Sequence, residues 1–199
     1  MTIVFDIIII IFSAILHEVS HGLAARALGD KTAEYAGRLT LNPIAHIDLY
    51  GSVLLPVLLW FVSGGNFLFA YAKPVPFNPY NLKYQQWGSA VVGVAGPLTN
   101  FVLAGVVALL IRSNVFPPAS VEFLVRVVVI NVSLGVFNMV PIPPLDGSKV
   151  LFALLPSRFD HLKFQLERYG MWVALIFVFF FSSLLFRPIE WVVRVLLGV

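Results

Sequence analysis

Residues 7–23 read "IIIIIFSAILHEVSHGL", an apolar run that ends in two histidines and a glutamate. A helix needs about 20 predominantly apolar residues to cross a lipid bilayer. Imidazole and carboxylate groups are costly inside such a segment, and where they occur they usually have a function. The stretch therefore predicts a transmembrane helix with a functional site at His17, Glu18 and His21, close to the end of the helix.

The composition extends the membrane prediction to the whole chain. Of the 199 residues, 59% are hydrophobic and 12% are charged, and the mean hydropathy is +0.92. Soluble domains carry roughly 25% charged residues. The formal net charge of +3 is ordinary for the loops of a membrane protein, so no nucleic acid is expected as a partner. Cysteine is absent, so a metal site must be built from His, Asp or Glu side chains.

Four stretches approach the length of a membrane span, namely 3–28, 88–111, 121–140 and about 171–186. A fifth, 51–71, is apolar but is interrupted by a proline and by the turn-forming "SGGN" at its centre. The tail from Arg187 can lie in the membrane interface or complete a last span. The predicted fold class is an all-α polytopic membrane protein with about four to six transmembrane helices and a re-entrant, hairpin-like element near 51–86. The N-terminal run lacks a basic region, so a cleaved signal peptide is not expected.

The two histidines lie four residues apart, one helical turn, so both imidazoles can reach one ion. Glu18 is offset by about 100° around the helix, close enough to touch a metal-bound water without being a ligand. This H-E-x-x-H pattern is typical of zinc hydrolases, in which the glutamate takes a proton from the attacking water. The alternative to a metal site is a purely structural role, in which the histidines lie at the membrane interface near a helix end and the glutamate is paired to Arg26 or solvated.

Zinc in hydrolases usually has three protein ligands, so a third is needed. Asp146 is the strongest candidate, because it follows the proline-rich "VPIPP" segment after an apolar helix and precedes Gly147. The competing interpretation is that Asp146 only caps the helix that begins after it, since Asp is a preferred N-cap. His46 and Asp48, in "NPIAHID", are weaker candidates for the third ligand.

"HEVSHG", "AGPLTN" (95–100) and "NMVPIPPLDG" (138–147) together resemble the site-2 protease family of intramembrane zinc metalloproteases, in particular its short prokaryotic members. The resemblance covers residues 16 to about 155. It implies zinc ligands at His17, His21 and Asp146, one zinc ion per chain, and a general base at Glu18. It also implies active-site roles in substrate or transition-state contact for the two asparagines of the motifs, Asn100 and Asn138.

The composition predicts one helical membrane domain, and no stretch is long enough for a second, soluble one. Residues 1–199 are expected to form a single metalloprotease domain, with the catalytic core at about 3–155 and C-terminal helices at 165–199. Residues 97–138 leave no room for the PDZ domain that some members of the family insert there.

The expected function is hydrolysis of peptide bonds within or near the transmembrane segments of membrane-anchored proteins. The protein itself is expected to be embedded in the lipid bilayer. A different class of function, a metal-ion or proton transporter that uses the intramembrane His and Asp groups, remains open, as does a zinc-free structural relative. Replacement of Glu18 by glutamine separates protease from transporter, because only the protease needs a base.

The three metal ligands constrain the topology, because the ends of the helices that carry them must lie on one side of the membrane. This requires residues 51–71 to enter and return on that side, with a turn at 63–66, rather than to cross. The basic residues then divide nine to four, so the positive-inside rule predicts a cell-membrane protein whose site opens to the cytoplasm. The nine are Arg26, Lys31, Arg38, Lys73, Lys83, Lys149, Arg158, Lys163 and Arg168, and the four are Arg112, Arg126, Arg187 and Arg194.

Overall fold

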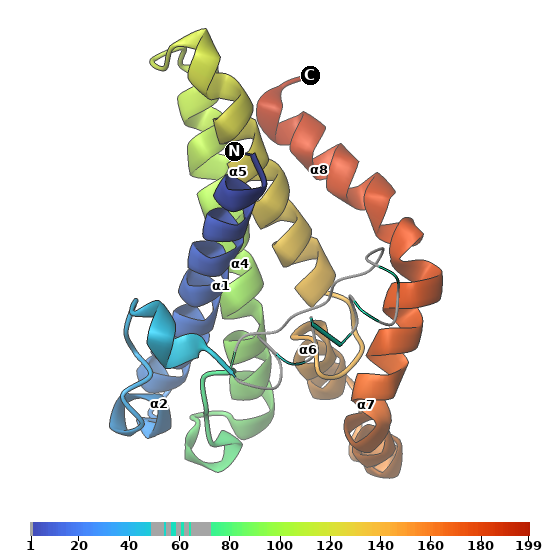
Figure 1. Cartoon of the computed structure of the whole chain (residues 1–199). Helices are drawn as coiled ribbons and strands as arrows, with labels where there is room; N and C mark the ends of the chain where they lie inside the picture. The colour runs from blue at the N-terminus through green and yellow to red at the C-terminus, as the bar shows by residue number, and fades with distance from the viewer. Residues whose placement is uncertain (1, 49–53, 55–56, 59–60, 62–63, 65–72) are drawn as a thin grey trace.

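The computed structural model describes residues 2–48, 54, 57–58, 61, 64 and 73–199, and the elements in it are helices (Figure 1). The long helices α1, α4 and α5 contact one another, and α7 and α8 follow at one side. The elements are α1 (Thr2–Ala27), α2 (Thr32–Tyr35), η1 (Pro43–His46), η3 (Pro79–Asn81), α4 (Gln85–Arg112), α5 (Pro118–Asn138), α6 (Gly147–Leu154), η4 (Ser157–Phe159), α7 (Asp160–Phe181), η5 (Ser182–Leu185) and α8 (Phe186–Leu197).

Within the described part of the chain, four helical segments are long and apolar enough to span a membrane. They cover Val4–Ala27, Trp87–Arg112, Pro118–Asn138 and Ser157–Leu197. Apolar side chains remain exposed along them; on α1, for example, Ile7 is 50% and Phe12 is 52% exposed. A surface of this kind belongs in lipid rather than water. The predicted all-α polytopic membrane fold is therefore confirmed.

The last segment begins earlier than the sequence predicts. Helix α7 begins at Asp160, but the apolar stretch in the sequence begins only at about 171. Hydropathy misses the first turns of the helix because they carry charged side chains such as Lys163. The α4–α5 connection is only residues 113–117, so no PDZ domain lies between these helices.

The helices α4 and α5 form a close seam. Ala104 and Ala108 of α4 face Val128 and Val132 of α5, and all four are at most 1% exposed. Small side chains let the backbones of membrane helices approach closely. The apolar side of α8 packs against this seam through residues such as Ile189 and Val193, so the C-terminal tail is an amphipathic helix bound to the bundle.

The loops at the C-terminal end of α1 lie at the N-terminal end of α4. The N–H of Lys83 donates to the carbonyl of Leu28 at 2.8 Å, and the N–H of Lys73 donates to the carbonyl of His46 at 2.9 Å. Residues 48 and 73, which flank the predicted re-entrant element, thus lie at the same end of the bundle. The element itself is almost wholly outside the described residues, apart from positions such as Gly64, which has a φ of +63°.

Asp30 fastens these loops to each other. Its buried carboxylate accepts hydrogen bonds from the N–H of Asn78 at 2.7 Å, the Nδ2 of Asn81 at 3.0 Å, and the backbone and hydroxyl of Thr32. Burial raises the pKa of such a carboxyl, but these four donors outweigh it and hold the pKa of Asp30 below its usual value. The ionised carboxylate therefore holds segment 73–83 against the end of α1.

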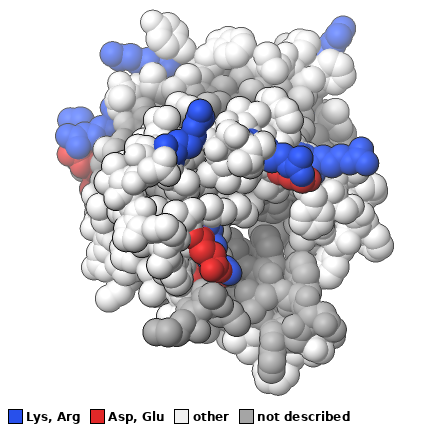
Figure 2. Space-filling model, turned by 90° about the horizontal axis from the view of Figure 1, so that it is seen from above, with Lys and Arg blue, Asp and Glu red and all other residues white. Residues whose placement is uncertain are grey.

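The opposite end carries the α4–α5 connection and the C-terminus (Figure 1). Figure 2 views the molecule from that end, where most of the surface is uncharged and the Lys and Arg side chains are scattered.

Candidate metal centre

Helix α1 supplies two side chains of the site. His17 and His21 lie one turn apart on α1 and are 5% and 6% exposed. Their Nε2 atoms are 3.1 Å apart. His17 lies ten residues before the end of α1 at Ala27, which places it about 15 Å along the helix axis from that end. The pair is therefore inside the bundle and not at its surface.

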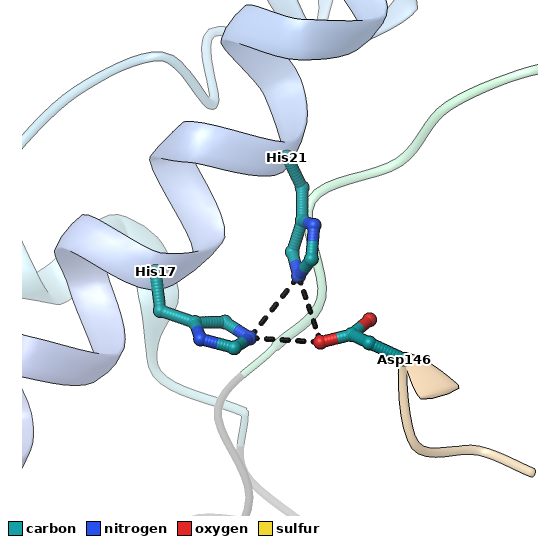
Figure 3. Close-up of side chains that lie close together, drawn as sticks. All are labelled: His17, His21 and Asp146. Carbon is teal, nitrogen blue, oxygen red and sulfur yellow. Dashed lines mark hydrogen bonds and ion pairs between the residues drawn. The ribbon is translucent and has the colours of Figure 1, made fainter. Parts of the chain in front are cut away.

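Asp146 brings a carboxylate to these histidines from the turn between α5 and α6 (Figure 3). Its Oδ2 lies 3.0 Å from Nε2 of His17 and 3.1 Å from Nε2 of His21. Its Oδ1 accepts a hydrogen bond from Nζ of Lys149 at 2.7 Å. Asp146 occupies the N-cap position of α6, but among the described residues its side chain makes no capping hydrogen bond. The capping interpretation is therefore wrong for this side chain.

The prolines and a glycine explain how Asp146 returns to the site. Prolines after α5 prevent that helix from continuing. A Cβ atom on Gly147 would collide with the carbonyl group of Met139, so the turn is too tight for any other residue. Helix α7 supports the same segment, because Gly170 packs directly on Pro143.

Helix α4 orients both imidazoles from behind. Nδ1 of His21 lies 2.6 Å from the carbonyl oxygen of Val92. A carbonyl only accepts, so Nδ1 of His21 carries the proton and its Nε2 presents a lone pair. Nδ1 of His17 lies 2.5 Å from Oδ1 of Asn100. Metal-bound histidines typically donate their second N–H in this way.

The three facing atoms fit a metal ion. Burial raises the pKa of an Asp carboxyl, but at Asp146 the contacts with His17, His21 and the Lys149 ammonium hold the pKa well below its usual range. The anion and two imidazole nitrogens at 3.0–3.1 Å need a cation among them, either protons or a metal. Ligand atoms of a tetrahedral zinc, with bonds of about 2.0–2.1 Å, lie roughly 3.3 Å apart, close to the separation observed.

Gly96 leaves the space that an ion needs. A Cβ atom at this position of α4 would lie 2.5 Å from Nε2 of His17 and 2.5 Å from Nε2 of His21. Any side chain here would therefore occupy the position in front of both nitrogens. Among the described residues, His17, His21 and Asp146 form the one group of three or more His, Cys, Asp or Glu side chains arranged to hold a metal.

Glu18 is held by a backbone group that sequence reasoning missed. Its Oε2 accepts a hydrogen bond from the N–H of Val75 at 2.8 Å. Pro74 and Pro76 flank Val75 and have no N–H, so Val75 provides the single backbone donor of this tripeptide. Arg38, which is 8% exposed, donates to the carbonyl of Lys73 at 2.6 Å and so clamps the segment. The proline pattern in "KPVPF" is the only sequence signal for this contact.

The structure separates the two asparagines of the motifs. Asn100 is fully buried and contacts His17, as described above. The Nδ2 of Asn138 donates to the carbonyl of Leu134 in its own helix at 3.0 Å. His46, a weaker candidate for the third ligand, instead bonds the carbonyl of Thr40 through Nε2 and lies outside the group of three.

Comparison with known proteins agrees with this geometry. The family model described as "Peptidase family M50" matches residues 5–118 and 114–181. "Putative zinc metalloprotease YwhC" of Bacillus subtilis (strain 168) is 33% identical over 85% of this chain and 78% of its own length. "Putative zinc metalloprotease Rip2" of Mycolicibacterium smegmatis is 34% identical over 69% of this chain and 52% of its own. "Zinc metalloprotease MJ0392" of Methanocaldococcus jannaschii is 26% identical over 78% of this chain and 36% of its own.

No solved structure matches the chain. The family match covers most of the chain, and the residues of its H-E-x-x-H motif meet a distant aspartate within the membrane bundle. The chain therefore belongs to peptidase family M50 and is a membrane zinc metalloprotease.

Proposed function

We propose that the chain binds one zinc ion through Nε2 of His17, Nε2 of His21 and Oδ2 of Asp146, and cleaves membrane-embedded protein substrates. The observation that carries the proposal is the triangle of three buried ligand atoms, 3.0–3.1 Å apart, with Glu18 beside it on the same helix. When bound, zinc supplies a Lewis acid that polarises a carbonyl and lowers the pKa of water to about 7.

Glu18 is the group that moves the proton. One oxygen of its carboxylate accepts the N–H of Val75, which leaves the other oxygen to accept a proton from the attacking water. Glu18 then passes that proton to the leaving amine, so the carboxylate ends the reaction ionised as it began. The hydrogen bond from Val75 fixes the side chain for both transfers.

The substrate must expose a peptide bond inside the bilayer. Carbonyls of an intact helix are shielded by their own hydrogen bonds, so the substrate helix has to unwind locally before attack. The two histidines are buried, roughly two to three helical turns before the end of α1. This depth favours substrates that are themselves membrane-anchored.

Removal of the metal tests the proposal. Purified protein in proteoliposomes is incubated with a panel of single-span proteins that carry helix-breaking residues in their spans. A zinc chelator is expected to stop cleavage, and stoichiometric zinc is expected to restore it, because the ligands come from buried side chains that neighbouring groups hold in place. Cleavage that continues at full rate in zinc-free protein contradicts the proposal, and zinc flux without cleavage favours a transporter.

We further propose that the site opens to the cytoplasm of a cell-membrane protein. Support comes from the segment between α1 and α4 and the last turn of α1, which together carry five basic residues at the end of the bundle that holds the loops. The positive-inside rule then assigns the orientation. These basic residues are Arg26 in the last turn of α1 and, in the segment that follows, Lys31, Arg38, Lys73 and Lys83.

Single cysteines in this cysteine-free chain test the orientation. Lys31, Lys83 and Ser157 are exposed and are expected on the cytoplasmic side, and Val115 is 72% exposed at the other end. A membrane-impermeant thiol reagent is expected to label cysteines at the first three positions only from the cytoplasmic side, and a cysteine at position 115 only from outside. Labelling of positions 31 and 83 from opposite sides contradicts the topology, and the reverse pattern at all four contradicts the orientation.

A further inference from the structure

Two buried asparagines lie behind His17, one on α4 and one on α5. Nδ2 of Asn100 lies 3.0 Å from Oδ1 of Asn131, and Nδ2 of Asn131 lies 2.9 Å from the carbonyl oxygen of Val127. The two side chains are 0% and 1% exposed. With the contact of Asn100 to His17, this makes a continuous chain of three hydrogen bonds from the backbone of α5 to the imidazole.

We propose that Asn131 is a positioning residue for metal binding, because it sets the direction of this hydrogen-bond chain and thereby the tautomer of His17. The inference rests on the proposed zinc site. Asn131 does not touch the metal ligands itself, because it acts on His17 through Asn100.

The direction follows from the end of the chain. The carbonyl of Val127 can only accept a hydrogen bond, so the NH₂ group of Asn131 must face it. Oδ1 of Asn131 is then turned toward Asn100 and accepts from its NH₂ group, which turns Oδ1 of Asn100 toward His17. An amide is symmetric enough to fit either way round, and only its partners decide between the two orientations.

The consequence appears at the metal site. Nδ1 of His17 must donate to Oδ1 of Asn100, so the neutral imidazole carries no proton on Nε2, which faces Asp146. Without an acceptor at position 131, Asn100 is free to turn its NH₂ group toward Nδ1 of His17. The proton of His17 then belongs on Nε2, where it competes with a metal ion. His21 needs no such relay, because a backbone carbonyl fixes it directly.

Substitution of Asn131 by leucine tests the role. Loss of the acceptor is expected to weaken zinc binding by about 10- to 100-fold, the range seen when the partner of a metal-bound histidine is removed. Affinity is measured on purified full-length protein by competition with a chelator of known affinity, with zinc alone as the probe. Asn131→Asp keeps an oxygen acceptor for Asn100, and burial favours its protonated carboxyl, whose O–H can donate to the carbonyl of Val127. This variant is expected to bind zinc within a few-fold of wild type.

Val129→Leu is the control. Val129 lies two residues before Asn131 on the same helix, is 38% exposed and takes no part in the relay. Its zinc affinity is expected to equal that of wild type. If the leucine variant at position 131 does not elute as folded protein, Asn131→Ala removes the acceptor with less steric change.

The outcomes separate the two proposals. Wild-type protein that binds no zinc overturns the proposed function. Wild-type protein that binds zinc, together with a folded Asn131→Leu or Asn131→Ala variant of equal affinity, overturns only the role of Asn131. An equal loss in Val129→Leu also overturns it, because the effect then follows from general damage to α5. An equal loss in Asn131→Asp does the same, because the acceptor is then not what matters.

Discussion

Replacement of Glu18 by glutamine is expected to lower the rate of cleavage by about 10²- to 10⁴-fold while the zinc content stays unchanged. Glutamine has nearly the same shape as glutamate, and its amide oxygen can still accept the hydrogen bond from Val75. The segment that contains Val75 therefore stays in place, as do the three metal ligands. What is lost is the ability to take a proton from water, so the substitution isolates the base.

The measurement uses purified variant and wild type with the same membrane-embedded substrate, with zinc determined on the same samples. Glu190→Gln is the control, because Glu190 is an exposed residue of α8 that pairs with Arg194 on the surface. It is expected to cleave at the wild-type rate. Full activity of Glu18→Gln would remove Glu18 as the base, whereas loss of zinc from this variant would assign it a role in metal binding instead.

The spans and the grouping of His17, His21 and Asp146 could be predicted because each rests on local sequence features. A run of apolar residues determines its own burial in lipid, and a spacing of four on a helix places His17 and His21 side by side without knowledge of the remaining fold. Asp146 is within reach of the same reasoning because charged groups are rare in this apolar chain, and a carboxylate after "VPIPP" stands out.

The residues that support the site could not be predicted, because their roles depend on the register between helices. Asn131 and Asn138 make the same local hydrogen bond, each donating to the carbonyl four residues before it. Only the relative position of α4 and α5 decides that Asn131 faces Asn100. The contact of Val75 with Glu18 likewise depends on loops joined by Asp30 and Arg38, which come long before Val75 in the sequence.

Replacement of Gly96 by alanine is expected to reduce zinc from about one ion per chain to background, although it adds a single methyl group. The Cβ atom would lie 2.5 Å from both Nε2 atoms, closer than any non-bonded contact allows. Those nitrogens cannot retreat, since His17 is held by Asn100 and His21 by the carbonyl of Val92. The helix itself favours alanine over glycine by up to about 1 kcal/mol, so the defect is expected at the site rather than in α4.

Gly105→Ala is the control for this substitution, because it makes the same change in the same helix where a Cβ atom would meet nothing within 4 Å among the described residues. Zinc content and cleavage are measured for both variants after the same purification. We expect Gly105→Ala to retain both, and Gly96→Ala to elute as folded protein without zinc. Wild-type zinc in Gly96→Ala would mean that the ion does not sit between the two histidines and α4, and the ligand triangle would then have to be assigned a role in holding the helices together by shared protons.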